Sequence, residues 1–187
     1  MDFMLKYMLN CDSSQARRQH PDVQTYAILI HGLCKNRKLD EALELFRDME
    51  EKQLPIHIVI YNILIGAMCK VGNLADAKEI FSLLSSKGLK PDVRTYTVMI
   101  DGLFRGGLVG EAINLLREME EHGCPPDSCT YNLMIRGLVR NKETPRALQL
   151  VTEMLANGFS ADASTFELFV NLVASGKIDP SLKPSTY

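Results

Sequence analysis

A polar position recurs along this 187-residue chain at intervals of 35 residues. Its occupants are Ala27, Asn62, Thr97, Asn132 and Glu167. Asparagine and threonine side chains donate and accept hydrogen bonds, and a carboxylate accepts them. The apolar residues on either side hardly change, so the pattern indicates a constant frame that carries one adjustable hydrogen-bonding residue in each unit.

A basic position has the same period. Its members are Lys35, Lys70, Arg105 and Arg140. A cation at this place can complement the dipole at the end of a helix, or a row of four can face an anionic ligand. Acidic residues gather on the segments that follow, as at Glu41, Glu44 and Asp48. This segregation makes the formal net charge of -2 compatible with a locally basic surface.

Catalytic and metal-binding patterns are not found. The histidines lie in unrelated places, at His20, His31, His57 and His122. No phosphate-binding glycine loop, deaminase signature or nucleophile elbow is present. The five cysteines are Cys11, Cys34, Cys69, Cys124 and Cys129. Their odd number favours a reducing compartment, and their spacing does not match a zinc site. We predict no enzymatic activity, no metal and no cofactor, with Cys34 and Cys69 as small core residues.

The frame around these residues is a repeat. An aromatic residue stands at Tyr26, Tyr61, Tyr96, Tyr131 and Phe166, and a small residue at Ala42, Ala77, Ala112 and Ala147. Apolar residues at helical spacing predict two helices in each unit. A single helical hairpin cannot bury both its apolar faces, so neighbouring hairpins must stack. The predicted fold is all-α, a right-handed α-solenoid of stacked helix-turn-helix hairpins.

The period also fixes the predicted boundaries. Four complete repeats span 23–57, 58–92, 93–127 and 128–162, and a partial fifth, with one helix, spans 163–176. Residues 1–22 are interpreted as the remnant of an upstream repeat plus a linker, and residues 177–187 as a tail.

Turn residues punctuate the repeats. Aspartates at 22, 92, 127 and 162 are expected to cap first helices, and Thr144 to cap a helix whose first residue is Pro145. Gly88, Gly123 and Gly158 are expected to end second helices in a left-handed conformation.

Four stretches carry a more specific signature: DVQTYAILIHGLCKNRKLDEALELFRDME, YNILIGAMCKVGNLADAKEIF, GLKPDVRTYTVMIDGL and PPDSCTYNLMIRGLVR. They resemble pentatricopeptide repeats of the P class, and the resemblance covers residues 23 to about 176. Tetratricopeptide repeats fit less well, because they have a 34-residue period and a tryptophan near the start, whereas this chain keeps 35 and has no tryptophan.

The resemblance implies selective binding of single-stranded RNA, one base per repeat. In the family, bases are read by the residue after the aromatic together with the last residue of the same repeat. Here those pairs are Asn62 with Asp92, Thr97 with Asp127, and Asn132 with Asp162. The family's pairing rule then gives a core site of U-G-U. A first pair, Ala27 with His57, matches no regular combination and is assigned no base.

Two further roles follow from the resemblance. Lys35, Lys70, Arg105 and Arg140 would contact phosphates. Base stacking would fall to Val59, Arg94 and Cys129, of which only Val59 is the valine usual in the family; Gln24 and Ser164 occupy the same position in the outer repeats.

The last residues, from Ala163 onward, are similar to the ends of restorer-of-fertility-like members. This similarity implies a plant protein of the mitochondrion, with the chloroplast as the alternative, that acts in organellar RNA processing, stability or translation. Single-stranded RNA is the expected partner, with a nuclease or other effector protein, or self-association, as a further one, and no membrane. The alternatives are a scaffold for protein interactions, or a short degenerate paralogue that binds RNA weakly.

Overall fold

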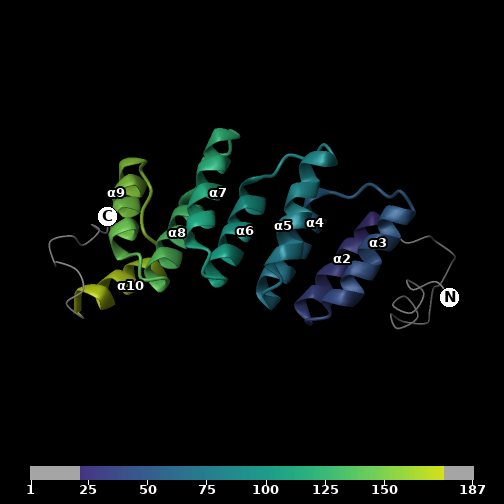
Figure 1. Ribbon diagram of the computed structural model, residues 1–187, viewed down its shortest axis with the longest axis horizontal. Coiled ribbons are helices and arrows are strands. Elements are labelled where there is room, and N and C mark those ends of the chain that lie inside the picture. Colours follow the sequence, from purple (N-terminus) through teal and green to yellow (C-terminus); the bar gives the residue numbers. More distant parts are fainter. Residues whose placement is uncertain (1–21, 175–187) are drawn as a thin grey trace. The chain divides into compact units, whose positions relative to one another are not determined.

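The computed structural model describes residues 22–174, and within them every regular element is a helix (Figure 1). Of the predicted remnant repeat and linker at 1–22, residues 1–21 lie outside the described residues, and so do Cys11 and the predicted tail at 177–187. The chain divides into two compact units, the first ending at Lys90 and the second beginning at Pro91. The predicted all-α helical repeat is confirmed.

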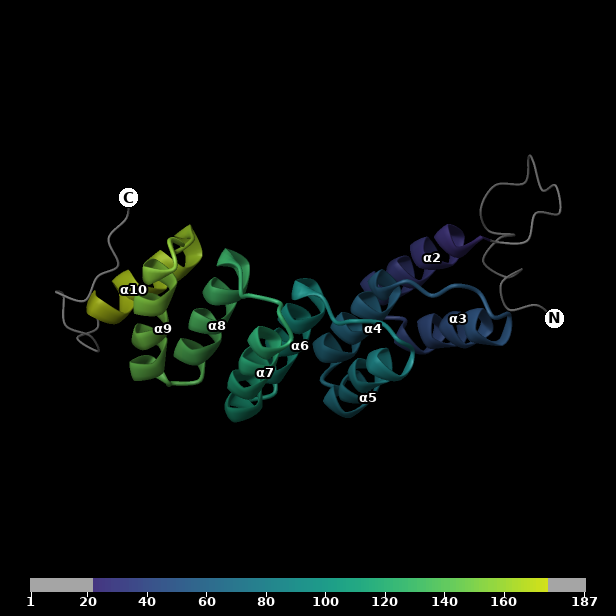
Figure 2. The same cartoon turned by 90° about the horizontal axis from the view of Figure 1, so that it is seen from above.

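The first unit holds two hairpins. Its helices are α2 (Val23–Lys35), α3 (Leu39–Glu51), α4 (Ile58–Val71) and α5 (Leu74–Ser86). The first helices of the hairpins, α2 and α4, pack against each other and form one layer, and α3 and α5 form the other (Figure 2).

The second unit repeats this plan and adds one helix. Its helices are α6 (Val93–Arg105), α7 (Val109–Glu121), α8 (Ser128–Arg140), α9 (Thr144–Ala156) and α10 (Ala163–Ala174). Here α6 packs against α8, and α8 against α10. Within each unit, a first helix therefore lies beside the next first helix, which places equivalent residues of those repeats close together.

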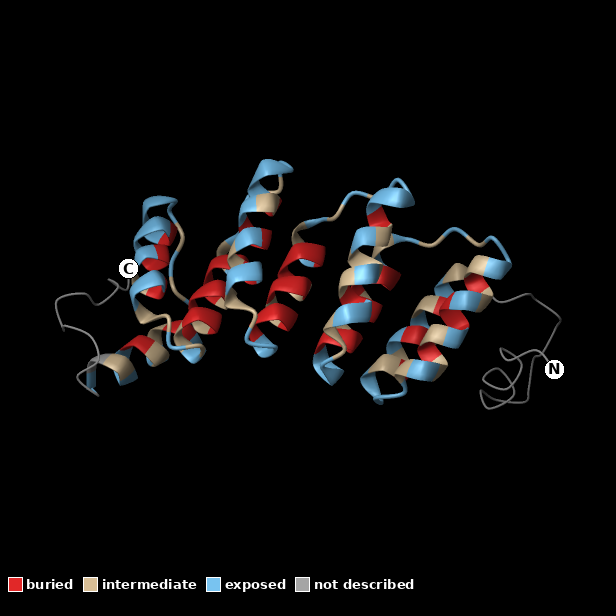
Figure 3. Ribbon diagram, in the orientation of Figure 1, coloured by how far each residue is buried: buried red, intermediate tan, exposed pale blue. Residues whose placement is uncertain are grey.

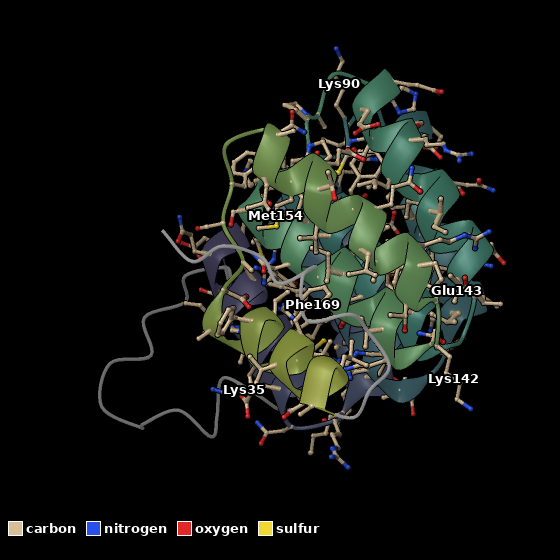
Figure 4. All side chains as sticks on the ribbon, turned by 90° about the vertical axis from the view of Figure 1, so that its left-hand side faces the viewer. Lys35, Lys90, Lys142, Glu143, Met154 and Phe169 are labelled. Carbon is tan, nitrogen blue, oxygen red and sulfur yellow. The ribbon has the colours of Figure 1, made fainter. Side chains whose placement is uncertain are left out.

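The period-35 frame forms the core. The small residues Ala42, Ala77, Ala112 and Ala147 have no exposed surface, so the two helices of each hairpin approach closely. Met154 of α9 and Phe169 of α10, labelled in Figure 4, are also buried. Figure 3 shows the buried residues along the faces where the helices of each unit meet.

The recurrent tyrosines join the helices of each hairpin. Their rings are buried, and their hydroxyl groups reach the end of the second helix. Tyr96 Oη lies 2.7 Å from His122 Nδ1, and Tyr131 Oη donates to Glu153 at 3.0 Å. Burial explains why the residue is aromatic, and the polar contact explains why it is tyrosine at Tyr26, Tyr96 and Tyr131.

The predicted caps are present at the first helices. The side chains of Asp22, Asp92, Asp127 and Asp162 each accept a hydrogen bond from the backbone N–H three residues later. The glycines expected to end second helices have left-handed φ angles, with Gly88 at +70° and Gly123 at +74°. Both sets of predictions are confirmed.

One predicted cap is wrong. Helix α9 begins at Thr144, and its N-cap is Glu143, with no side-chain cap bond. Thr144 therefore lies inside the first turn, and Pro145 follows it one position further in than expected. Proline is still accommodated, because the N–H groups of the first turn have no acceptor within the helix.

A tight helix contact distinguishes the second unit. A methyl group added at Gly137 of α8 would lie 2.4 Å from the Phe104 ring of α6, so only glycine allows this approach. The same repeat position in the first hairpin, Gly32, has nothing within 4 Å.

The cysteines with described positions are free thiols. Cys69 is buried as predicted, whereas Cys34 is only half-buried. Burial raises the pKa of the Cys34 thiol to about 11, against a smaller opposing effect of the Lys70 charge. Cys34 therefore stays protonated at neutral pH. Among the helices of residues 22–174, none is long and apolar enough to cross a membrane.

Candidate nucleic-acid interface

The first turn of each first helix presents one exposed side chain at the same repeat position. These residues are Gln24, Val59, Arg94, Cys129 and Ser164. Val59 is 59% exposed, which is unusual for a valine in a helix with so apolar a sequence. An apolar or flat side chain exposed here can lie against the face of a base.

The adjustable position lies one turn further along the helix and is largely buried. Asn62 and Thr97 are each 9% exposed, and Asn132 is 2% exposed. Ala27 is half-buried, and Glu167 is exposed. A buried polar side chain has to be hydrogen-bonded, so its partners fix its orientation.

In the third repeat, Thr97 is connected to Asp127 through a second threonine. Thr97 Oγ1 donates to the carbonyl of Val93 and lies 3.4 Å from Thr130 Oγ1. Thr130 Oγ1 in turn donates to Asp127 Oδ1 at 2.8 Å. The two residues predicted to read one base therefore both lie against the Thr130 hydroxyl, whose single proton is used for Asp127.

In the fourth repeat the link is direct. The backbone N–H of Asp162 donates to Asn132 Oδ1 at 2.9 Å, and Asn132 Nδ2 donates to the carbonyl of Ser128 at 2.8 Å. The Asn132 amide is thereby held between its own helix and the start of α10. The structure brings together the Asn132–Asp162 pair that the family resemblance selected.

An arginine also contacts Asp162, the second residue of this pair. Arg136 Nη1 lies 2.7 Å from Asp162 Oδ2 and 3.0 Å from Thr165 Oγ1. Burial acts to raise the pKa of Asp162, but the Thr165 N–H and the Arg136 guanidinium outweigh it, and the pKa is lowered. The carboxylate is therefore ionised and already bonded on one side.

The first predicted pair cannot form such a link. Ala27 has no polar side chain, and His57 is an exposed N-cap without a side-chain cap bond. Asn62 lies in the first unit and Asp92 in the second, where Asp92 caps α6 in a capping box with Thr95.

The four recurrent cations all lie in the last turn of a first helix, as predicted. They are the exposed residues Lys35, Lys70, Arg105 and Arg140. Arg105 Nε is paired with Asp101 at 2.7 Å. The position suits the helix dipole, and exposure leaves the charges available to a ligand.

Sequence reasoning missed two features of this interface. The first is the threonine three residues after each capping aspartate, at Thr25, Thr95, Thr130 and Thr165. The D-x-x-T spacing could have indicated it. The second is Arg136, which no repeat signal predicts, because the residue varies from unit to unit at this position.

Comparisons with known proteins identify the repeat family. A model of the PPR repeat family matches residues 57–105, 98–140 and 126–174, and a PPR repeat model matches residues 17–50. A pentatricopeptide repeat-containing protein of Arabidopsis thaliana is 58% identical over 33 residues, which are 18% of this chain and 4% of that protein.

Solved structures show the same fold. The pentatricopeptide repeat protein PPR10 in complex with an 18-nt psaJ RNA element matches with a TM-score of 0.77 and 26% identity, over 90% of this chain and 26% of that one. The PPR domain of Arabidopsis thaliana protein-only RNase P 1, in complex with tRNA, matches with a TM-score of 0.70 and 14% identity, over 92% and 91% of the two chains. The chain thus spans about a quarter of the PPR10 chain.

Proposed function

The chain belongs to the pentatricopeptide repeat family, and we propose that it binds single-stranded RNA with base selectivity, without itself catalysing a reaction. The observation that carries the proposal is the pair of linked polar contacts in the second unit. Thr97 is connected to Asp127 through Thr130, and Asn132 bonds directly to the Asp162 backbone. Among the described residues, no group of three or more potential metal ligands lies together.

Base selectivity requires polar atoms in fixed positions. Asn132 and Thr97 are held by hydrogen bonds at buried positions of their helices, so their remaining donor and acceptor capacity has a defined direction. A base whose edge complements that direction gains affinity, and one that does not leaves polar groups unpaired. We assign guanine to the Thr97–Asp127 pair and uracil to the Asn132–Asp162 pair by the family's rule.

The full proposed site is U-G-U, with the first uracil assigned to Asn62 and Asp92. Stacking is assigned to the exposed first-turn residues Val59, Arg94 and Cys129. Cys129 is the weakest of the three platforms, since it has neither a flat guanidinium nor a branched apolar side chain.

Phosphate contacts are assigned to the last-turn cations Lys35, Lys70, Arg105 and Arg140. Electrostatic contact with the backbone supplies affinity without base selectivity. Arg105 has its Nε paired with Asp101, so its Nη groups are the ones assigned to the ligand.

We further propose that the RNA is an organellar transcript, in the mitochondrion or else the chloroplast, and that an effector protein acts on the bound strand. The match to a plant relative supports this assignment. A restorer-of-fertility-like role is the narrowest form of the proposal and rests on the similarity of the final residues.

A titration tests RNA binding. A 12-nucleotide strand carrying U-G-U in an adenine background is compared with a strand of the same composition in scrambled order, each at two salt concentrations. We expect the U-G-U strand to bind more tightly than the scrambled strand. The affinity should also fall with salt: the logarithm of the binding constant, plotted against the logarithm of the salt concentration, should have a slope of about −0.7 for each phosphate contacted.

Charge variants complete the experiment. Lys70→Gln combined with Arg140→Gln should lower both the affinity and the salt slope, whereas Arg117→Gln, on a second helix, should change neither. A chain that binds neither strand at low salt contradicts the proposal and favours a protein-binding scaffold. Equal affinity for both strands indicates a weak, unselective paralogue.

A further inference from the structure

A groove of about 440 Å³ lies in the second unit, away from the interface described above. It runs between the second helices α7 and α9, and α8 forms its base. Leu116, Met134, Leu138 and Leu150 line it, and each is less than 10% exposed. A hollow of this size with an apolar base can accept a large aliphatic side chain.

Charged residues at the rim of the groove are arranged along its length. Arg146 and Glu153 lie on α9, seven residues or roughly 10 Å apart. Arg117 and Glu120 lie in the same order on α7. The rim is therefore acidic towards the carboxyl ends of both helices, with Arg117 one turn before Glu120, and it is basic at the amino end of α9.

The first unit shows what this acidic end lacks. There Glu50, at the equivalent position to Glu120, pairs with Lys87 at 2.9 Å, and the pair ties the end of α3 to the end of α5. Two repeats later the lysine is replaced by Asn157, whose side chain donates to Tyr131 Oη at 2.8 Å. Leu83 of the first unit is replaced by Glu153.

The substitutions change the local charge. Glu50 and Lys87 balance each other, whereas Glu120 and Glu153 together carry two negative charges. Among the ion pairs within residues 22–174, neither carboxylate has a basic partner. Burial, and then the charge of Glu153, raise the pKa of Glu120, so a cation placed between them would be favoured.

We propose that this groove binds a segment of another protein in which a lysine or arginine follows a leucine-sized residue. The aliphatic side chain would lie on Leu116, Met134, Leu138 and Leu150, and the cation would take the place that Lys87 occupies in the first unit. Arg146, near the amino end of α9, would favour an acidic residue at the other end of the segment. Nucleic acid is a poor occupant, since its phosphates would meet Glu120 and Glu153.

A peptide titration tests the proposal with the full chain. The probe is an end-blocked hexapeptide EALLAK, and its control is EALLAQ, which lacks only the cation. Binding is followed by chemical-shift changes in two-dimensional NMR spectra. We expect shifts confined to α7, α8 and α9, and an affinity for EALLAK at least fivefold higher than for EALLAQ.

Variants of the protein test the role of the two carboxylates in the same titration. The double variant Glu120→Gln, Glu153→Gln should bind both peptides equally, whereas Glu121→Gln, next to the groove, should keep the fivefold difference. Circular dichroism confirms that each variant is folded.

Three results would overturn the proposal. The first is equal affinity of the natural chain for both peptides. The second is shifts in the groove on addition of an RNA strand. The third is self-association of the chain that the double variant abolishes, because it would assign the groove to a second copy.

Discussion

The two units are built from the same repeat positions but treat them differently at three places. The first unit has Gly66 where the second has Arg136, and Lys87 where the second has Asn157. Position 104 is phenylalanine and packs on Gly137, whereas the equivalent pair of the first unit is Cys34 and Ala67. The buried tyrosines and alanines are alike in both. The comparison shows that the residues packed inside each hairpin stay the same from unit to unit. Residues at the edges of the hairpins vary, so the two units can differ in what they bind.

The largest expected effect is a loss of protein stability when the tight Phe104–Gly137 contact of the second unit is disrupted. Gly137→Ala places a methyl group 2.4 Å from the Phe104 ring. Forcing helices or a ring apart in a packed core costs about 2–3 kcal/mol. Chemical denaturation should show that loss of unfolding free energy.

The matched control is Gly32→Ala, at the same repeat position with open space around it. Alanine favours the helix by about 0.5–1 kcal/mol over glycine, so this variant should be more stable than the natural chain. Destabilisation of equal size by both substitutions would contradict the tight contact between α6 and α8.

A smaller effect is expected from Arg136→Ala. Its partner Asp162 is about half exposed, so the lost ion pair should cost about 0.5–1 kcal/mol at neutral pH. Because the pKa of Asp162 is lowered in the folded state, this stability is present above its unfolded pKa and is lost as pH falls through the folded value.

The difference between Arg136→Ala and the natural chain should therefore disappear in strongly acidic solution. Arg140→Ala, one turn later on α8, has no ion-pair partner among the described residues and should show no such pH dependence. A difference between natural chain and Arg136→Ala that is independent of pH would show that packing, not charge, holds Arg136.

The smallest effect concerns the acidic end of the groove. The pKa of Glu120 is raised in the folded state, so its charge opposes folding above that pKa, and the opposition disappears as pH falls through it. Glu120→Gln should stabilise the chain at neutral pH by less than about 1 kcal/mol, since burial of the carboxylate is only partial and most of the side chain is exposed.

At a pH below the ordinary value of 4.5 the gain should vanish. Thermal unfolding at pH 7 and pH 4 measures the change. Glu121→Gln is the control, and an equal gain from it would show that the effect is one of overall charge.

Much of this fold follows from the sequence because a 35-residue period constrains every element at once. The tyrosines, the alanines, the aspartate caps and the terminal glycines occupy the predicted places. The predicted N-cap at Thr144 was wrong because helix α9 begins at Thr144 itself. The helix starts one residue earlier than it would if Pro145 were its first residue. Such an end depends on backbone geometry that a single residue type does not fix.

The site was only partly predictable for a different reason. The sequence selected Asn132 and Asp162 by resemblance, but their hydrogen bond depends on how closely α8 approaches α10. The Arg136–Asp162 pair likewise links α8 to the start of α10, and the Phe104–Gly137 contact joins residues of neighbouring repeats. Their partners are set by packing, which residue types within one repeat do not reveal.

The central claim is that one residue in each repeat selects one base, and Thr97→Asn tests it most directly. Asn132 shows that asparagine fits this repeat position, with its amide bonded to the carbonyl four residues earlier. Short strands that differ only in the base between the two uracils are titrated against the natural chain and the variant. We predict that the natural chain prefers guanine there and the variant uracil, each by about 1–2 kcal/mol, or roughly 5- to 30-fold. An unchanged preference for guanine in a folded variant would contradict the account.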